Sequence, residues 1–168
     1  MDVRYINPFV KSVCNVFETM CNMPVKVGKP MLKDGNGPAA HVSGVIGFSG
    51  GATGCVVLNF QLDTACKLAS AFAGIEITPD HPDFADAIGE LANMVAGGAK
   101  AHFDGLDINI SLPNVIVGQN HRVADSKSTP HLLIPCSTDG GDFFVEVAMV
   151  IGNSKPKTAK AASVGVSS

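Results

Sequence analysis

The chain of 168 residues has few aromatic and few charged residues, and its basic residues form no cluster before the last fifteen positions. Aromatic residues make up 6% and charged residues 16%, and the formal net charge is −3. Proteins that bind nucleic acids usually carry a dense Lys/Arg patch, often with aromatic side chains that stack on bases. The composition therefore argues against a nucleic-acid partner.

Long apolar runs are also missing. No segment approaches the roughly 20 apolar residues that a membrane-spanning helix needs. The N-terminal sequence MDVRYINPF lacks the basic region followed by an apolar region of a signal peptide. We expect a cytoplasmic protein that is not bound to a membrane.

The cysteines and histidines show no metal-binding pattern. The cysteines are odd in number and lack C-x-x-C spacing, and the histidines lack H-x-x-x-H spacing. We expect structural, reduced thiols in apolar settings, and histidines that are surface or cap residues. The residues are Cys14, Cys21, Cys55, Cys66 and Cys136, and His41, His81, His102, His121 and His131.

The composition that remains is that of one globular domain. Hydrophobic residues make up 46%, and the length suits a single domain with a sizeable core. After residue 152 the sequence NSKPKTAKAASVGVSS offers too little apolar surface to offset the entropy of ordering. We predict a domain over residues 1–152 and a flexible tail over residues 153–168.

Two helices are predicted in the first half of the chain. The Asn7–Pro8 pair suits a helix start, since Asn caps free N–H groups and Pro fits the first helical position. Apolar residues at helical spacing extend this helix to about Met20. Asp63 is a candidate cap for a second helix, which should end at Gly74.

Six segments have the pattern of strands, being either alternating or continuously apolar and bounded by turn residues. Prolines at positions 113 and 135 indicate strand edges, ends or bulges there. With a third helix in the middle of the chain, the fold class is α/β of the α+β type: a mostly antiparallel six-stranded sheet with three helices, the first and third on one face. The segments are VKVGKPMLK, HVSGVIGF, GCVVLNF, DINISLPNVIVG, PHLLIPC and GDFFVEVAMVI.

Residues 47–51 match G-x-S-x-G, the nucleophile elbow of serine hydrolases. That motif requires a strand, a sharp turn and a helix. Here another strand follows, so the glycines indicate a hairpin turn and Ser49 is not expected to be a nucleophile.

The stretch Asp80–Phe103, which predicts a helix ending at Gly105, has an unusual polar face. Glycines interrupt this face, and each costs about 1 kcal/mol relative to alanine. Two interpretations remain open: a site that another surface approaches closely, or a solvated face with a tight helix contact at the glycines. Residues Phe84, Ala87, Ile88, Leu91 and Val95 fall on the apolar side, and Asp83, Asp86, Glu90, Asn93, Gly97 and Lys100 on the polar side.

Asp86, Glu90 and Asn93 form the pattern D-x-x-x-E-x-x-N. A carboxamide has both a donor and an acceptor, so it can hold a water molecule in line with a phosphorus atom. A carboxylate one turn earlier can bind a cation on the partner that carries the phosphate.

Several segments together resemble the CheC/CheX/FliY family of chemotaxis phosphatases, above all its CheX branch. They occur in the family's order and extend over roughly residues 1–150. They are NPFVKSVCNVFETM, VSGVIGFSGGATGCVVLNF, DAIGELANMVAGGAKAHF, LPNVIVG and FFVEVAMV.

The resemblance implies a phosphatase that hydrolyses the aspartyl phosphate of a CheY-like response regulator. It implies that Glu90 pairs with a lysine of the receiver and that Asn93 orients the attacking water, with Asp86, Gly97 and Lys100 as further docking positions. It also implies a homodimer and no cofactor on this chain, because the receiver keeps its own Mg²⁺.

The first helix bears on the number of sites. CheC-like relatives carry a second motif there, but Glu18 is followed three residues later by Cys21 rather than by asparagine. We therefore expect one site per chain. A proline of the family motif corresponds to Pro113, with 19 residues between it and Asn93, which is a shorter spacing than in CheC, so its role stays open.

Two rival functions remain. The polar helix could dock a receiver without hydrolysing its phosphate, as a binding or adaptor module. The chain could also be a structural component like the FliY branch, which carries an additional motor domain that is not found in this sequence.

Overall fold

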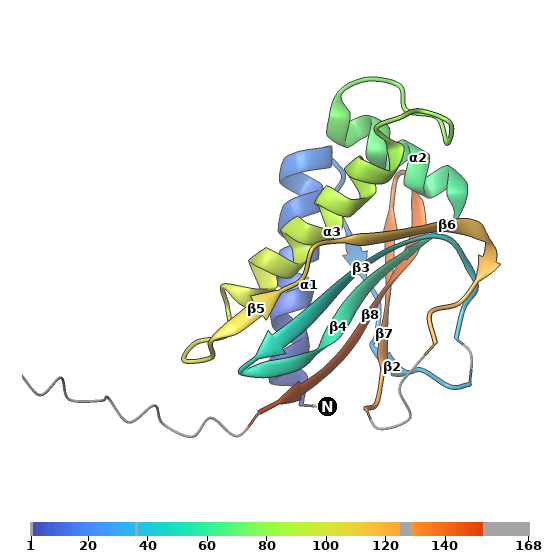
Figure 1. Ribbon diagram of the computed structural model, residues 1–168. Coiled ribbons are helices and arrows are strands. Elements are labelled where there is room, and N and C mark those ends of the chain that lie inside the picture. The colour runs from blue at the N-terminus through green and yellow to red at the C-terminus, as the bar shows by residue number, and fades with distance from the viewer. Residues whose placement is uncertain (1, 36, 125–128, 153–168) are drawn as a thin grey trace, which may run out of the picture.

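The computed structural model describes residues 2–35, 37–124 and 129–152. Three helices pack on one face of an antiparallel sheet, as Figure 1 shows. The helices are α1 (Val3–Cys21), α2 (Leu62–Ala73) and α3 (Phe84–Lys100). The strands are β1 (Lys26–Val27), β2 (Met31–Leu32), β3 (Ala40–Gly50), β4 (Ala52–Phe60), β5 (Ile108–Ile110), β6 (Asn114–His121), β7 (Leu132–Thr138) and β8 (Gly141–Ile151).

The predicted fold class is confirmed, but the sheet has eight strands rather than six. Two predicted segments are each divided in two. The first becomes β1 and β2, which both pair with β7. The segment around Pro113 becomes β5 and β6, which both pair with β3. In the order β1-β7-β8-β4-β3-β5, β1 and β2 lie at one edge of the sheet beside β7, and β5 and β6 lie at the other edge beside β3.

Proline explains where these edge strands break. Pro113 lies between β5 and β6, and a proline has no N–H for a sheet hydrogen bond. Pro135 lies within β7, at the point where its partner changes from β1 to β2, and its carbonyl accepts a bond of 2.7 Å from the Gly28 N–H. The prediction of a strand end is confirmed at Pro113, whereas at Pro135 the pairing with β8 is continuous and only the pairing with β1 and β2 is interrupted.

Helix α1 begins at Val3, so the predicted start at Asn7–Pro8 is wrong. The carboxylate of Asp2 caps the helix by accepting a 2.9 Å bond from the Arg4 N–H. Pro8 lies inside the helix, where it leaves one intrahelical bond unmade. The earlier start is favoured by packing, because it brings the Tyr5 ring against Phe103 at 6.3 Å.

Helix α2 begins one residue before Asp63, with Gln61 at the N-cap position, so Asp63 is not the cap. The Asp63 carboxylate instead forms an ion pair of 3.1 Å with Lys67, one turn later. The Gln61 amide donates to the Ala39 carbonyl at 3.0 Å, which fixes the entry to the helix. The predicted end is confirmed, since Gly74 caps α2 with a φ of 71°.

Helix α3 ends at Lys100, before the predicted end at Gly105. The chain then turns so that Phe103 packs back against α1, with its ring 5.9 Å from that of Phe9. Gly105, with a φ of 75°, belongs to the turn that follows. Packing of Phe103 therefore ends the helix earlier than the amphipathic pattern indicates.

The main core lies between the helices and the sheet and contains buried aromatic rings from both layers. Phe17 of α1 packs edge-on against Phe143 of β8 at 5.0 Å. Among the helices described, none is long and apolar enough to span a membrane. The predicted tail, residues 153–168, lies outside the described residues, so the predicted domain division stays a prediction.

Candidate functional site

Helix α3 lies across β3, between α1 on one side and β6 on the other (Figure 1). The contact with β3 is close. A Cβ atom on Gly44 would lie 2.9 Å from the Cβ of Ala92 and 3.5 Å from the side chain of Ile88. The absence of a side chain at Gly44 therefore lets the helix rest directly on the strand.

Two of the helix glycines serve internal packing. On the α1 side, a Cβ on Gly98 would collide with the Ser12 hydroxyl, which donates a 2.7 Å bond to the Val95 carbonyl. On the β6 side, a Cβ on Gly89 would lie 3.4 Å from the Pro113 ring. The interpretation as tight contacts is thus correct for these glycines.

Gly97 differs, because a Cβ there would meet no atom within 4 Å. The packing of the described residues therefore does not require a glycine at position 97. The absence of a side chain leaves open space on the outer surface of α3 between Asn93 and Lys100.

We call the outer surface of α3 the α3 ridge. Its residues recur at steps of three and four and extend over about 21 Å at 1.5 Å per residue. Three are exposed and two are partly buried, and none of their side chains forms a hydrogen bond or ion pair with another residue of the described ranges. The structure thus brings the five predicted site residues to one side of the helix. They are Asp86, Glu90, Asn93, Gly97 and Lys100.

The chemistry of the α3 ridge suits a partner rather than a small molecule. A carboxylate and a carboxamide one turn apart, standing on a rigid helix, can enter a recess of another protein. Their hydrogen-bonding groups are available for that partner, because the described part of the fold does not use them. The ridge therefore offers a carboxylate that can pair with a cation and a carboxamide that can hydrogen-bond a water molecule.

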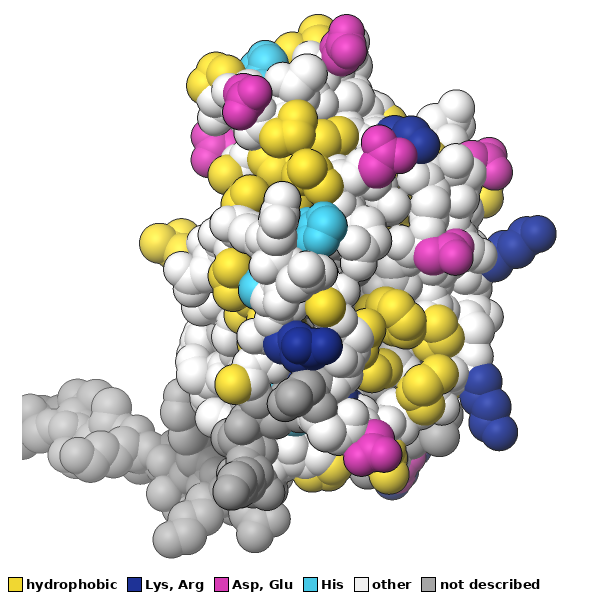
Figure 2. Space-filling model, turned by 90° about the vertical axis from the view of Figure 1, so that its right-hand side faces the viewer, with side chains coloured by type: hydrophobic (Ala, Val, Ile, Leu, Met, Phe, Trp, Pro, Cys, Tyr) yellow, Lys and Arg dark blue, Asp and Glu magenta, His cyan; other side chains and the backbone are white. Residues whose placement is uncertain are grey.

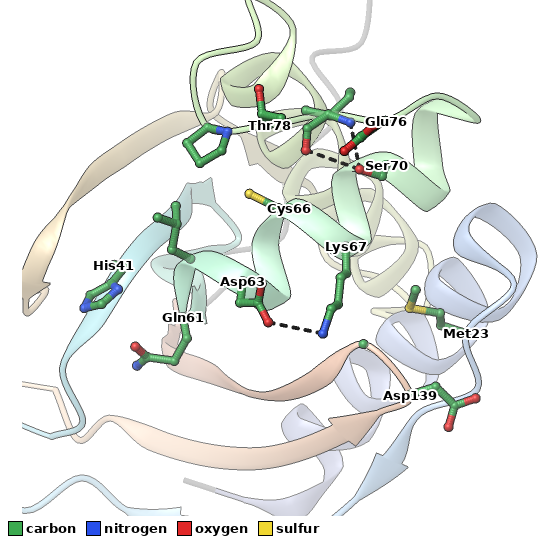
Figure 3. Close-up of a pocket in the computed structure, with 14 residues that line it drawn as sticks. Met23, His41, Gln61, Asp63, Cys66, Lys67, Ser70, Glu76, Thr78 and Asp139 are labelled. Carbon is green, nitrogen blue, oxygen red and sulfur yellow. Dashed lines mark hydrogen bonds and ion pairs between the residues drawn. The ribbon is translucent and has the colours of Figure 1, made fainter.

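A groove beside α2, with a volume of about 880 Å³, is an alternative location for a site (Figure 3). Figure 2 shows hydrophobic side chains gathered on this face of the molecule, between charged ones. Within the groove, Asp63 and Lys67 pair with each other, and the Ser70 hydroxyl accepts a bond from the Ile77 N–H at 2.8 Å. Burial, reinforced by Asp63, raises the pKa of the Cys66 thiol, which keeps it protonated. Cys66 is therefore not an activated nucleophile.

A buried polar network, which the sequence pattern did not predict, lies on the face of the sheet opposite the helices. Glu146 and Lys33 form an ion pair of 2.9 Å, with side chains 2% and 3% exposed. The same carboxylate oxygen lies 2.6 Å from Nδ1 of His131. His131 is thus buried and paired, so the expectation of a surface or cap role is wrong for it. The single acidic residue in the apolar run FFVEVAMV is the signal that could have indicated this pairing.

The network continues across the sheet toward the edge strand β6. The Asn59 amide nitrogen lies 3.4 Å from Glu146, and its oxygen accepts from the Ser43 hydroxyl at 2.7 Å. Ser43 is also 2.7 Å from Nε2 of His121 on β6. We call these residues the outer-face network: Lys33, Ser43, Asn59, His121, His131 and Glu146.

The other sequence motifs have structural roles. Strands β3 and β4 form a hairpin joined at Gly51, with Gly50 at a φ of 91°, so residues 47–51 are not a nucleophile elbow. No disulfide links the cysteines, and burial raises the pKa of Cys21 to about 11 and that of Cys136 to about 12. Among the described residues, no group of three or more His, Cys, Asp and Glu side chains could hold a metal ion.

Comparisons with known proteins agree on one family. The family model described as chemotaxis phosphatase CheX matches residues 42–137. The CheY-P phosphatase CheX of Thermotoga maritima is 31% identical over 126 residues, which cover 73% of this chain and 81% of that protein.

Solved structures give the same result. A CheC-like superfamily protein from Shewanella sp. PV-4 has a TM-score of 0.80 and 34% identity, covering 89% of this chain and 99% of that one. The CheX–CheY–BeF3–Mg²⁺ complex from Borrelia burgdorferi has a TM-score of 0.72 and 27% identity, covering 86% and 97%. The chain belongs to the chemotaxis phosphatase CheX family.

Proposed function

We propose that this protein is a phosphatase that hydrolyses the aspartyl phosphate of a CheY-like response regulator and that the α3 ridge carries the reaction. The observation that carries the proposal is the Glu90–Asn93 pair on the outer surface of α3, whose side chains have no partner among the described residues. The relative from Thermotoga maritima, a CheY-P phosphatase, and the Borrelia burgdorferi complex of CheX with CheY support this substrate class.

Asn93 is the catalytic residue in this proposal. Its amide oxygen accepts a hydrogen bond from a water molecule and its amide nitrogen donates one, which aligns the water with the phosphorus atom. The water oxygen forms a bond to phosphorus while the bond to the aspartyl oxygen breaks. Inorganic phosphate leaves, and the receiver regains its carboxylate.

Glu90 and its neighbours dock the receiver. The Glu90 carboxylate pairs with a cationic side chain next to the phosphorylated aspartate, which places Asn93 one turn further along the helix. Asp86 and Lys100 provide charges at the two ends of the ridge, and Gly97 leaves room for close approach. We assign the Mg²⁺ ion to the receiver, in keeping with its presence in the Borrelia burgdorferi complex.

We also propose a homodimer that forms through the edge strand β6. This strand pairs only with β3 among the described strands, and it exposes Ile116 and Val117. An unpaired strand edge with apolar side chains favours pairing with a second copy. Light scattering at micromolar concentration should give twice the chain mass of 17.3 kDa, and a mass of one chain would contradict the dimer.

The proposed activity is tested by following phosphate loss from a purified, phosphorylated receiver with and without this protein. We expect faster loss with the wild type and almost none of that gain with Asn93→Ala. Binding of the phosphorylated receiver without faster decay would instead identify a docking module. A protein with this substrate would act in the cytoplasm, where response regulators are phosphorylated.

A further inference from the structure

Leu112, in the connection between β5 and β6, is the most exposed large apolar side chain of the described residues, at 87%. Isolated exposed leucines are common on protein surfaces and need no explanation by themselves. The position of this one is informative, because the next residue, Pro113, packs against Gly89 at the base of the α3 ridge.

The backbone that carries Leu112 is held firmly. The Ser111 N–H donates to the Gly47 carbonyl at 2.9 Å, and the Ser111 hydroxyl accepts from the Gly47 N–H at 2.9 Å. The same hydroxyl lies 2.9 Å from the Leu112 carbonyl, to which it donates. Pro113 then restricts the next φ angle. The exposure of Leu112 is therefore built into the fold and is not a property of a loose loop.

The direction of the elements places Leu112 on the side of Pro113 that faces the C-terminal half of α3, where Asn93 lies. Figure 1 shows α3 ending near β5, which pairs with the last residues of β3, so α3 and β3 run the same way. Strand β6 runs opposite to β3. Moving back from Pro113 to Leu112 therefore leads from Gly89 toward Asn93, which lies one turn further on the same side of the helix, about 6 Å along its axis.

We propose that Leu112 is an apolar docking residue that packs against the receiver beside the phosphorylated aspartate, and this rests on the proposed function. Charged and amide groups of the α3 ridge fix the orientation of the receiver, whereas Leu112 adds apolar area that is removed from water only in the complex. Its site is continuous with the ridge through Pro113 and Gly89.

A second copy of the chain is a less suitable partner for Leu112 than the receiver. A dimer that extends the sheet would pair along β6, whose bonding to β3 begins at Asn114. Leu112 precedes that strand, and the adjacent Ser111 is already bonded to β3. Ile116 and Val117 lie within β6 and suit the interface between copies.

The test is binding of a receiver activated with beryllium fluoride, measured by calorimetry for wild type and Leu112→Ser. We expect about tenfold weaker binding, equivalent to about 1.4 kcal/mol, and a KM for phosphate loss that rises by a similar factor. Leu112→Met should restore the affinity. The matched control is Leu32→Ser, which alters a leucine 65% exposed on β2 at the other edge of the sheet and should change nothing.

Equal receiver affinity of wild type and Leu112→Ser would overturn the assignment of Leu112 as a docking residue. A loss of affinity accompanied by a change in oligomeric mass would overturn it as well. If the wild type binds the receiver without speeding its decay, the phosphatase proposal fails, while the tenfold loss in Leu112→Ser still supports Leu112. If the wild type does not bind the activated receiver, both proposals fail.

Discussion

The α3 ridge and the outer-face network both contain acidic and amide side chains, but the fold treats them in opposite ways. In the network, the Glu146 carboxylate is buried and contacts Lys33 and His131. On the ridge, Glu90 is exposed and has no partner within the described residues. Polar side chains that find hydrogen-bond or ion-pair partners within the fold hold strands together. Polar side chains that the fold positions without giving them such partners are available for another molecule.

The largest expected effect comes from breaking the network. Glu146→Ala removes the carboxylate of a buried ion pair, which typically costs about 3–5 kcal/mol because the remaining charge is poorly solvated. Denaturant unfolding should show this loss, and Glu146→Gln should lose less because it keeps an acceptor. A loss below about 1 kcal/mol would mean that the network is unimportant for stability.

Asn93→Ala should reduce activity and leave stability almost unchanged, the opposite of what is expected for Glu146→Ala. Losing one group that positions a reactant typically costs about 10²- to 10³-fold in rate, so phosphate loss should fall by that factor. The unfolding free energy should stay close to that of wild type, because the Asn93 side chain makes no hydrogen bond to a described residue. Full activity in this variant would remove Asn93 from the mechanism.

Two adjacent glycines of α3 have different roles: Gly98 is required by packing against α1, whereas Gly97 faces open space. Gly98→Ala places a Cβ against the Ser12 hydroxyl, and such overpacking typically costs about 1–3 kcal/mol. Gly97→Ala meets open space and should stabilise the helix by up to about 1 kcal/mol. The same unfolding experiment measures both variants, and equal effects would contradict the packing difference.

Much of this organisation could be predicted from sequence because it depends on local periodicity. The helical spacing of α3 places Glu90 and Asn93 on the side away from the core, and the glycine-rich hairpin excludes Ser49 as a nucleophile. The predictions are wrong where contacts between residues distant in the sequence determine the structure. Phe103 ends α3 early by packing on α1, and His131 is buried because Glu146 lies on the neighbouring strand.

Glu90→Ala should have the smallest effect, since ion pairs at accessible surfaces usually contribute about 0.2–1 kcal/mol. Receiver binding should weaken by up to about fivefold, and phosphate loss should slow mainly at low receiver concentration. Because the lost interaction is between charges, the salt dependence of binding should also become flatter. Asp86→Ala, one turn earlier, is the matched control for the removal of a negative charge from the ridge. If both variants weaken binding equally and leave the same salt dependence, only the net charge of α3 matters and Glu90 has no specific docking role.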